Sequence, residues 1–555
     1  MSFEEITNKS LELLARLSFP KLKEVLKILL NFIEDLRVEN EKAKDENQRL
    51  KDEINRLKGE KGKPDIKPSK KPEESDNEKK RNDSDRLEKR KGKSSKKDRI
   101  KITRKKELPI DKSTLPPDAE YKGTRSVVVQ DIKIVLDNIE FVIERYYSPS
   151  QNKVFESELP PEYKDREFGP GIRTYVLTNH YQARIPQKLL HTILTGLGVI
   201  ISEGQIGAIL VSRHNEPFHQ EREAARRAGI EKNSYQQIDD TGARLNGKNI
   251  YTIVTCNDDF CSFTTSERKD RLSALKALSG LSELKYIIND IAITYIGDKV
   301  SRKVLVRELE KLKSDRIYSC EEFRREILNA PFIVGQIDAW KKHVEEGCAI
   351  GAYRENFLGP GSDVLVCDDA PQFKGILEYL GLCWVHEERH YDKLIPRHSH
   401  FQKELDNFLD KFWDYYDALK KYKENPTQEK KGALSIEFDE LFSADTDYFA
   451  LNSVIKKSAK KKESLLLVLE YPEIPLHNNT SELDIREKVI QRKIRNCFRS
   501  IRGAKASDTF LSLMAICRKQ GITFWDYIQD RVYNLQKIPS LAEIIKNGQP
   551  VLDPI

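Results

Sequence analysis

Residues 237–264 read QIDDTGARLNGKNIYTIVTCNDDFCSFT, with an acidic pair near the start and two apolar runs after an Asn-Gly turn. Asn246-Gly247 is a strong hairpin signal, because both central residues of such a two-residue turn take positive φ. The runs at 250–256 and 260–264 are rich in β-branched and aromatic residues, which predicts two further strands. We therefore expect an antiparallel meander whose first strand carries Asp239 and Asp240.

Further acidic residues lie far along the chain. Asp368-Asp369 closes an apolar run at 363–368 that predicts a fourth strand, and the run at 382–386 predicts a fifth. Glu482 stands at the beginning of a helical stretch. An acidic residue on the first strand of a meander, with another at the end of the fourth, indicates an α/β protein with a ribonuclease-H-like catalytic domain. The sequence at about 272–355 and 391–470 has a helical pattern, and we interpret these two segments as insertions into that domain.

Asp239, Asp368 and Glu482 together can hold two divalent cations, because Mg²⁺ and Mn²⁺ prefer oxygen ligands. Such a pair of ions cleaves and joins phosphodiesters. Each of these three residues also has an alternative interpretation. Asp240 and Asp369 are one-residue alternates as ligands, and residues 479–482 also form a capping-box pattern in which Glu482 needs no metal.

The helical stretch around Glu482 also carries side chains suited to DNA. Asn479, Glu482 and Arg486 are three or four residues apart and share one helix face. The basic residues that follow either contact phosphates or form a solvated basic face. The candidate DNA-binding residues are Asn478, Asn479, Arg486, Arg492, Lys493 and Arg495.

Cys383-x-x-His386 raises the question of zinc, since His390, His398 and His400 follow it closely. The group lacks a second cysteine pair, and Cys383 lies in an apolar run. A packed cysteine is favoured over a zinc ligand, and His386 is expected beside the active site.

Several of these motifs, in the same order, resemble the insertion-sequence-66 family of DDE transposases. Asp239-Asp240-Thr241-Gly242 is similar to the family's Asp-Glu-Thr, and Asp368-Asp369 to its Asp-Gly. Cys383-Trp384-Val385-His386 is similar to Cys-Trp-Ala-His. Residues 477–486, HNNTSELDIR, resemble Asp-Asn-Asn-x-x-Glu-Arg-x-x-Arg, and Arg492-Lys493 with an apolar helix at 510–517 completes the match.

The resemblance implies an enzyme that nicks transposon-end DNA and joins the 3′-hydroxyl to target DNA. Asp239, Asp368 and Glu482 would then be the catalytic residues and the ligands of two Mg²⁺ or Mn²⁺ ions. His477 replaces an Asp and Leu483 replaces an Arg that the family usually has, and the loss of that Arg puts a DNA-phosphate or supporting contact in doubt. The family's upstream zinc-binding cysteines are also absent, because Cys256 is the first cysteine in the chain.

The N-terminal segment 1–58 carries an unbroken heptad register from Leu22 to Leu57. Leucine dominates the d positions, and the a positions include Ile33, Asn40 and Asn47. This pattern favours a parallel two-stranded coiled coil, and hence a homodimer or higher oligomer. The alternative is one amphipathic helix that packs on its own protein.

The rest of the amino-acid sequence predicts the other domains. Residues 59–107 are basic and lack apolar periodicity, which is typical of a disordered linker. A small β element is expected at 108–165, the position of the family's zinc-binding cysteines, with strands at 125–129 and 141–145. Residues 146–155 are expected to keep the shape of that zinc-binding element without the metal. A helical region follows at 166–232, with a capping box at 202–205, and its pattern fits a DNA-binding helix-turn-helix and a generic helical bundle equally well. The catalytic domain spans 233–500 and a helical region 501–555.

Composition limits the function classes. The chain has 555 residues, a net charge of +7 and 33% charged residues, and it shows no apolar run of the length that spans a bilayer. No signal-peptide pattern is visible, and the eight cysteines are scattered, so a reduced, cytoplasmic, nucleoid-associated prokaryotic protein is expected. Two other functions remain open, a structure-specific nuclease of the same fold and a non-catalytic DNA-binding scaffold.

Overall fold

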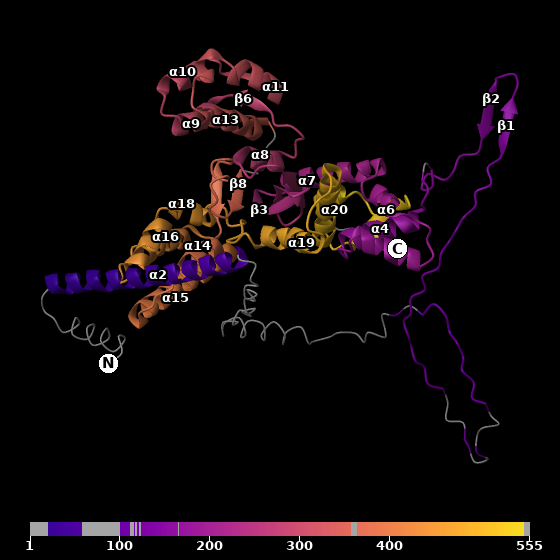
Figure 1. Ribbon diagram of the computed structural model, residues 1–555, viewed down its shortest axis with the longest axis horizontal. Coiled ribbons are helices and arrows are strands. Elements are labelled where there is room, and N and C mark those ends of the chain that lie inside the picture. The colour runs from indigo at the N-terminus through magenta and orange to yellow at the C-terminus, as the bar shows by residue number, and fades with distance from the viewer. Residues whose placement is uncertain are drawn as a thin grey trace. The chain divides into compact units, whose positions relative to one another are not determined.

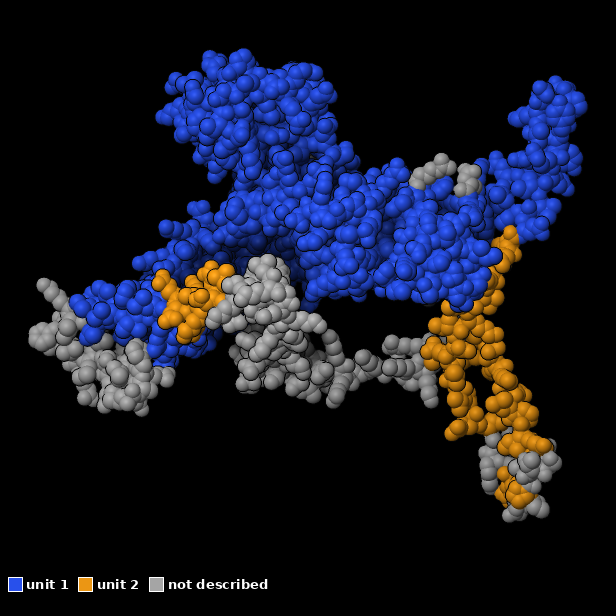
Figure 2. All heavy atoms as spheres, in the orientation of Figure 1, with its two compact units in different colours: residues 1–38, 140–555 blue, residues 39–139 orange. Residues whose placement is uncertain are grey.

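The computed structural model describes residues 20–57, 100, 102–111, 116, 119–120, 124–164, 166–356 and 363–548 (Figure 1). The chain divides into two compact units, one of residues 1–38 with 140–555 and one of residues 39–139 (Figure 2). The predicted linker at 59–107 lies outside the described residues except for 100 and 102–107. No helix within the described ranges is both long and apolar enough to cross a membrane.

A five-stranded mixed sheet forms the centre of the larger unit. Its strands are β3 (Tyr235–Leu245), β4 (Lys248–Cys256), β5 (Cys261–Ser266), β8 (Val364–Cys367) and β9 (Tyr379–Leu382). Their order is β5-β4-β3-β8-β9; β3, β4 and β5 pair antiparallel, and β8 pairs parallel with β3 and β9. This arrangement confirms the predicted meander and is consistent with a ribonuclease-H-like core.

The Asn-Gly turn joins β3 to β4 as expected. Asn246 has a φ of 48° and Gly247 a φ of 81°, so both residues occupy the left-handed region that a tight hairpin requires. The register that follows pairs Leu245 with Lys248 and Gln237 with Cys256. The local turn chemistry therefore fixes which residues of β3 face the core.

The predicted fifth strand at 382–386 is wrong in its bounds. β9 ends at Leu382, and Cys383 is the N-cap residue of helix α14 (Trp384–Asp392). Leu382 and Trp384 are both buried. The apolar run continues across the strand end and the helix start, and periodicity cannot separate the two in so short a run.

The predicted strands at 125–129 and 141–145 are also wrong. Residues 124–144 form no strand, and Val127 and Val129 are 65% and 80% exposed. The hairpin lies later, with β1 (Arg145–Ser148) paired to β2 (Lys153–Glu156) and Tyr146 opposite Phe155. β-branched content alone was misleading, because those valines have no apolar face to bury against. The element expected at 146–155 lies within this hairpin, and its likeness to the family's zinc-binding element stays a prediction.

Helices from both ends of the chain cover the meander. The N-terminal group contains α4 (Pro170–Tyr181), α5 (Gln187–Gly196), α6 (Glu203–Leu210) and α7 (Glu216–Lys232). The C-terminal group contains α19 (Asn479–Arg495), α20 (Ile501–Lys519), α21 (Phe524–Val532) and α22 (Leu541–Asn547). The capping box at Ser202 and Gln205 is confirmed, while a DNA-reading role for these helices remains a prediction.

Two insertions extend the sheet domain. The first comprises α8 (Arg271–Ser279), α9 (Asp290–Lys299), α10 (Lys303–Lys311), α11 (Cys320–Phe323), a π-helical turn (Arg324–Leu328), α12 (Pro331–Val334) and α13 (Asp338–Asn356). It also contains a two-stranded sheet of β6 (Tyr286–Ile288) and β7 (Ser314–Tyr318), which the sequence did not predict. The figure shows this insertion standing out from the central sheet (Figure 1).

The second insertion is helical, as expected. It comprises α15 (Ser399–Glu424), α16 (Gln428–Phe442), α17 (Phe449–Ala459), α18 (Lys462–Leu465) and a 3₁₀ turn (Leu467–Leu469). Its aromatic core gathers around Trp384, whose ring centroid lies 5.3 Å from that of Phe412 and 5.5 Å from that of Tyr415. The indole Nε1 donates a hydrogen bond to the Leu465 carbonyl.

Candidate active site

The parallel pairing of β3 with β8 brings two of the expected acidic residues into the same region. Gln237 pairs with Val366, so Asp239 and Asp368 occupy corresponding positions two residues further along. Asp368 follows Cys367, the last residue of β8. Neighbouring parallel strands end at the same sheet edge, which explains why residues distant in sequence meet here.

The pKa of Asp239 reflects this crowding. Burial, together with the nearby carboxylates of Asp368, Asp240 and Glu482, raises it from 3.8 to about 7, while a hydrogen bond from the Asp240 amide opposes them. The charges of Asp368 and Glu482 therefore both act on Asp239. Mutual repulsion of this kind is relieved when a cation binds between the groups.

The alternates Asp240 and Asp369 are neutralised by lysines. Lys269 Nζ lies 2.7 Å from Asp240 Oδ1, and Gln372 Nε2 donates to Asp240 Oδ2 at 2.9 Å. Lys374 and Lys461 lie 2.5 and 2.9 Å from the two Asp369 oxygens, and these contacts lower its pKa although burial opposes them.

Asp239 and Asp368 differ from these alternates. Across the residues that the structure describes, no Lys or Arg nitrogen lies within 4.0 Å of either carboxylate. Asp368 Oδ1 accepts a hydrogen bond from the Ala370 amide, at 3.2 Å. In each acidic pair, one residue is held in ion pairs with lysines and the other, among the described residues, is not.

Glu482 is not part of a capping box. Helix α19 begins at Asn479, its N-cap residue is Asn478, and no side-chain cap is formed. Glu482 Oε1 instead lies 3.2 Å from His386 Nε2, and its Oε2 lies 3.5 Å from Arg389 Nη2. Burial and Arg389 lower the pKa of His386, with Glu482 and Asp368 opposing them. The simpler explanation for this glutamate is thereby removed.

Polar contacts fix α19 against β3. Asn478 is fully buried, and its Nδ2 donates to the Ile238 carbonyl at 3.1 Å. The Ser481 amide donates to Gln237 Oε1 at 3.2 Å, and the Asn478 amide to Cys383 Sγ at 3.2 Å. These bonds hold the helix that carries Glu482 beside the strand that carries Asp239.

The sequence did not point to Gln237 or Arg389 as part of the site. Gln237 is a buried polar residue within β3, a position where an unpaired amide is costly. Arg389 lies three residues after His386 in α14, and its Nη1 contacts His386 Nε2 at 2.9 Å. Helical spacing from His386 was the one local signal that could have identified it.

The candidate DNA-binding residues divide into two groups. Asn479, Arg486 and Lys493 are exposed on α19. Asn478 is buried and occupied in anchoring the helix, and Arg492 and Arg495 donate hydrogen bonds to the carbonyls of Gly242 and His180. Burial lowers the pKa of Arg495 to about 10. The first group is therefore open to a phosphate, whereas the second already has protein partners.

The donor set suits hard divalent cations. It consists of carboxylate oxygens, and among the described residues the buried Glu482 Oε1 has its contact with His386 Nε2 but no hydrogen bond. The three groups are not all within 4.8 Å of one another; in the described part of the chain that criterion is met by His400, Glu404 and Asp447 in the second insertion. A site for two ions about 3.5–4 Å apart does not require all three carboxylates to meet at one ion. Cys383 is buried and accepts a backbone hydrogen bond, which favours the packed interpretation over zinc.

Comparison with known proteins identifies the family. The family model described as "Transposase IS66 family" matches residues 351–506, which include Asp368, His386 and Glu482. The chain is also 34% identical over 319 residues to the uncharacterized protein y4jO of Sinorhizobium fredii (strain NBRC 101917 / NGR234). That match covers 57% of this chain and 98% of the other protein. The chain belongs to the IS66 transposase family. The resemblance found in the motifs is thus confirmed, and membership indicates a DNA-acting transposase enzyme of the DDE class.

Proposed function

We propose that this IS66-family protein nicks transposon-end DNA and joins the resulting 3′-hydroxyl to target DNA by two-metal phosphoryl transfer. The observation that carries the proposal is the contrast within each acidic pair. Asp240 and Asp369 are bound by lysines, whereas Asp239 and Asp368, which lie at adjacent strand positions, have no such pair with any residue that the structure describes. Glu482 faces the same region from α19.

Asp239, Asp368 and Glu482 would hold two Mg²⁺ or Mn²⁺ ions. Bound there, the ions would supply Lewis-acid stabilisation of the attacking and leaving oxygens. The protein's own contribution is positioning. His386 and Arg389 contact the two oxygens of Glu482, and Gln237 and Asn478 hold α19 against β3. These contacts preorganise the carboxylates before DNA arrives.

DNA would be held by exposed side chains of α19. Asn479, Arg486 and Lys493 are accessible, and a helix of this kind contacts phosphates without reading bases. The partners would be transposon ends and target DNA at the prokaryotic nucleoid, and a homodimer or higher oligomer would form through the N-terminal coiled coil. Because Arg492 and Arg495 donate to carbonyls in this structure, we assign them to supporting the site.

The test is nicking and strand transfer on DNA that carries the element's own ends, with Mg²⁺ or Mn²⁺. Asp239→Asn, Asp368→Asn and Glu482→Gln should each lower the rate by at least about a thousandfold, since a lost ligand disables the ion pair. Asp240→Asn and Asp369→Asn are the matched controls, and they should lose about tenfold or less. End binding, measured by fluorescence anisotropy, should survive in all five variants.

Other outcomes would select a different function. Cleavage without strand transfer by the parent would favour the structure-specific nuclease. Specific end binding with no cleavage in either metal would favour the non-catalytic scaffold. Equal loss of activity in the Asp240 and Asp239 variants would contradict the ligand assignment.

A further inference from the structure

Lys461 lies in the turn between α17 and α18, and its ammonium group bridges two carboxylates. Lys461 Nζ lies 2.9 Å from Asp369 Oδ2 and 2.8 Å from Glu387 Oε2. The lysine side chain is 19% exposed, so salt screens these pairs less than it screens pairs on the surface. The bridge joins the second insertion to two separate parts of the sheet domain, the residues that follow β8 and helix α14.

Each carboxylate in this bridge is the next residue in the chain after a residue of the proposed active site. Asp369 directly follows Asp368, and Glu387 directly follows His386. His386 Nε2 in turn lies 3.2 Å from Glu482 Oε1. The bridge therefore ties the backbone that carries one carboxylate ligand to the backbone that carries the partner of another.

Both oxygens of Glu387 are bonded to the second insertion, and the residue is only 3% exposed. Oε2 meets Lys461, and Oε1 lies 2.6 Å from Ser458 Oγ, which is closer than the Val454 carbonyl, at 3.2 Å. Ser458 has one hydroxyl proton to give to Glu387, so the Tyr391 hydroxyl, 2.7 Å away, donates to Ser458. Loss of the lysine would leave a buried charge without its counter-ion.

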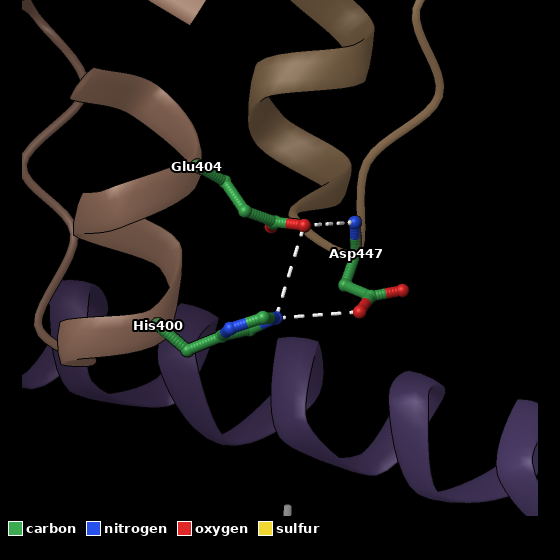
Figure 3. A group of neighbouring side chains, drawn as sticks. All are labelled: His400, Glu404 and Asp447. Carbon is green, nitrogen blue, oxygen red and sulfur yellow. Dashed lines mark hydrogen bonds and ion pairs between the residues drawn. The ribbon is translucent and has the colours of Figure 1, made fainter. Parts of the chain in front are cut away.

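Helix α17, which ends beside this bridge, is also fixed at its beginning (Figure 3). The Asp447 amide donates to Glu404 Oε1 at 2.9 Å, and Asp447 Oδ2 lies 3.3 Å from His400 Nε2. Both partners belong to α15. The position of Lys461 is thus supported from both ends of the helix that precedes it.

Helix α2 (Pro20–Leu57) adds to this support, because its side chains bond to backbone groups at the beginnings of α15 and α17. Asn31 Nδ2 donates to the Asp447 carbonyl and Asn31 Oδ1 accepts from the Phe449 amide, each at 2.9 Å, and Glu34 Oε1 accepts from the Arg397 amide at 2.5 Å. Buried bonds of this kind are costly to lose. The second insertion is therefore held in place before any metal or DNA binds.

We propose that Lys461 is a positioning residue for phosphoryl transfer. By bridging Asp369 and Glu387, it sets the separation between Asp368 and Glu482, two of the carboxylates that would hold the ions. The second insertion thereby acts on the active site through one side chain. This inference rests on the proposed function, because Lys461 has this role only where those carboxylates bind metal. Contacts of this kind, one step outside the ligands, change metal affinity or activity by about 10–100-fold when they are removed.

The Mn²⁺ affinity of the DNA-free protein tests this role by titration calorimetry. Lys461→Met removes the charge and keeps most of the side-chain length, and it should weaken Mn²⁺ binding by about tenfold or more. Lys462→Met is the matched control, because Lys462 Nζ lies 2.7 Å from Asp439 Oδ2, in an ion pair within the second insertion. The control should bind Mn²⁺ as the parent does. Equal affinity in Lys461→Met and the parent would overturn the proposal.

Nicking kinetics on end DNA provide a second readout. Lys461→Met should lower kcat by about tenfold or more and leave KM for DNA within about twofold, because the lysine positions the ligands rather than holding the substrate. Lys461→Arg keeps the charge and can pair with both carboxylates, so it should recover most of the loss. A change in KM with no change in kcat would make Lys461 a DNA contact and would refute the positioning role.

A double variant separates positioning from the neutralisation of a buried charge. Glu387→Gln/Lys461→Met removes the buried carboxylate together with its counter-ion, so the thermal midpoint should return towards that of the parent. Mn²⁺ affinity and kcat should stay low, because the link to Asp369 is still missing. Recovery of both quantities in the double variant would show that Lys461 only neutralises Glu387.

Failure of the proposed function would give a different result. A parent that binds Mn²⁺ but neither nicks nor joins DNA would contradict that function, while the ratio of Mn²⁺ affinities between Lys461→Met and the parent would still decide the role of the lysine. A parent that binds no Mn²⁺ would overturn both proposals, since there would be no ligand set to position.

Discussion

At the scale of single residues, the two acidic pairs show how one sequence pattern produces different electrostatic environments. Asp239 and Asp240 are neighbours in β3, yet successive strand residues point to opposite faces. Asp240 meets Lys269, while Asp239 is crowded by other carboxylates. The sequence left the choice between neighbours open, and partners remote in sequence distinguish them.

The raised pKa of Asp239 predicts that pH changes two quantities, the folding stability of the metal-free protein and its affinity for a divalent cation. Because this pKa is about 7 rather than 3.8, ionising the group costs folding free energy, so stability should fall as pH rises from about 4 to 7. Cation binding must displace the proton, so Mn²⁺ affinity should rise about tenfold per unit of pH below 7 and level off above it.

Titration calorimetry with Mn²⁺ at pH 6, 7 and 8 measures the second effect directly. Asp240→Asn should keep the pH dependence, whereas Asp239→Asn should lose it along with most of the affinity. An affinity that is the same at pH 6 and pH 8 in the parent would contradict the assignment of this pKa to the metal site.

At the scale of elements, close approach of helix and sheet sets which glycines are required. A Cβ added at Gly229 of α7 would lie 2.5 Å from Cδ1 of Phe260, and the side chain of Phe260 is fully buried. Gly432 in the interior of α16 has nothing within 4 Å of the corresponding point. Close packing against Phe260 requires glycine at position 229, whereas packing places no such requirement on position 432.

This contrast predicts opposite effects of the same substitution. Gly229→Ala should destabilise by about 1–3 kcal/mol, because Phe260 would have to move within a packed core. Gly432→Ala should stabilise by about 0.5–1 kcal/mol, because alanine loses less conformational entropy in a helix. Thermal midpoints of the two variants measured against the parent test the pair, and a stabilised Gly229 variant would contradict the close packing of α7 on the sheet.

Helix α19 carries a further prediction, about DNA. Arg486→Ala/Lys493→Ala should weaken end-DNA binding for all sequences alike and reduce the slope of log affinity against log salt by about 2, one unit per lost phosphate contact. Lys456→Ala/Lys457→Ala removes two exposed lysines from α17 and serves as the matched control. A salt slope equal to that of the parent would exclude these α19 residues as phosphate contacts.

At the scale of the whole molecule, the part of helix α2 (Pro20–Leu57) up to Val38 groups with residues 140–555 rather than with residues 39–139. Residues 1–38 group with 140–555, and residues 124–139 contain exposed tryptic sites at Arg125 and Lys133. A chain cut there should stay together through the contacts of Asn31 and Glu34.

Limited trypsin treatment followed by gel filtration examines this expectation. In the parent, the fragment that carries α2 should elute with the fragment that carries the sheet domain. In Asn31→Ala/Glu34→Ala the two should separate, because the bonds to Asp447, Phe449 and Arg397 are gone. Separation in the parent would show that α2 does not bind the larger fragment.

The sequence by itself determined the features that depend on neighbouring residues. Turn chemistry at Asn246-Gly247 and β-branched runs gave the meander, apolar periodicity gave α10, α15 and α19, and the order of acidic motifs gave the family. These signals are local, since a turn or a helix face is specified within a few residues. Strand bounds failed where an apolar run crossed from β9 into α14.

Tertiary structure alone decided which aspartate of each pair is free, that Glu482 contacts His386 rather than capping α19, and that Asn31 and Glu34 attach α2 to the second insertion. Each of these depends on partners such as Lys461 and Asp447 that come from distant parts of the chain. Ion pairing and burial act between residues that are close in space, and no local pattern records which distant residue will be the neighbour.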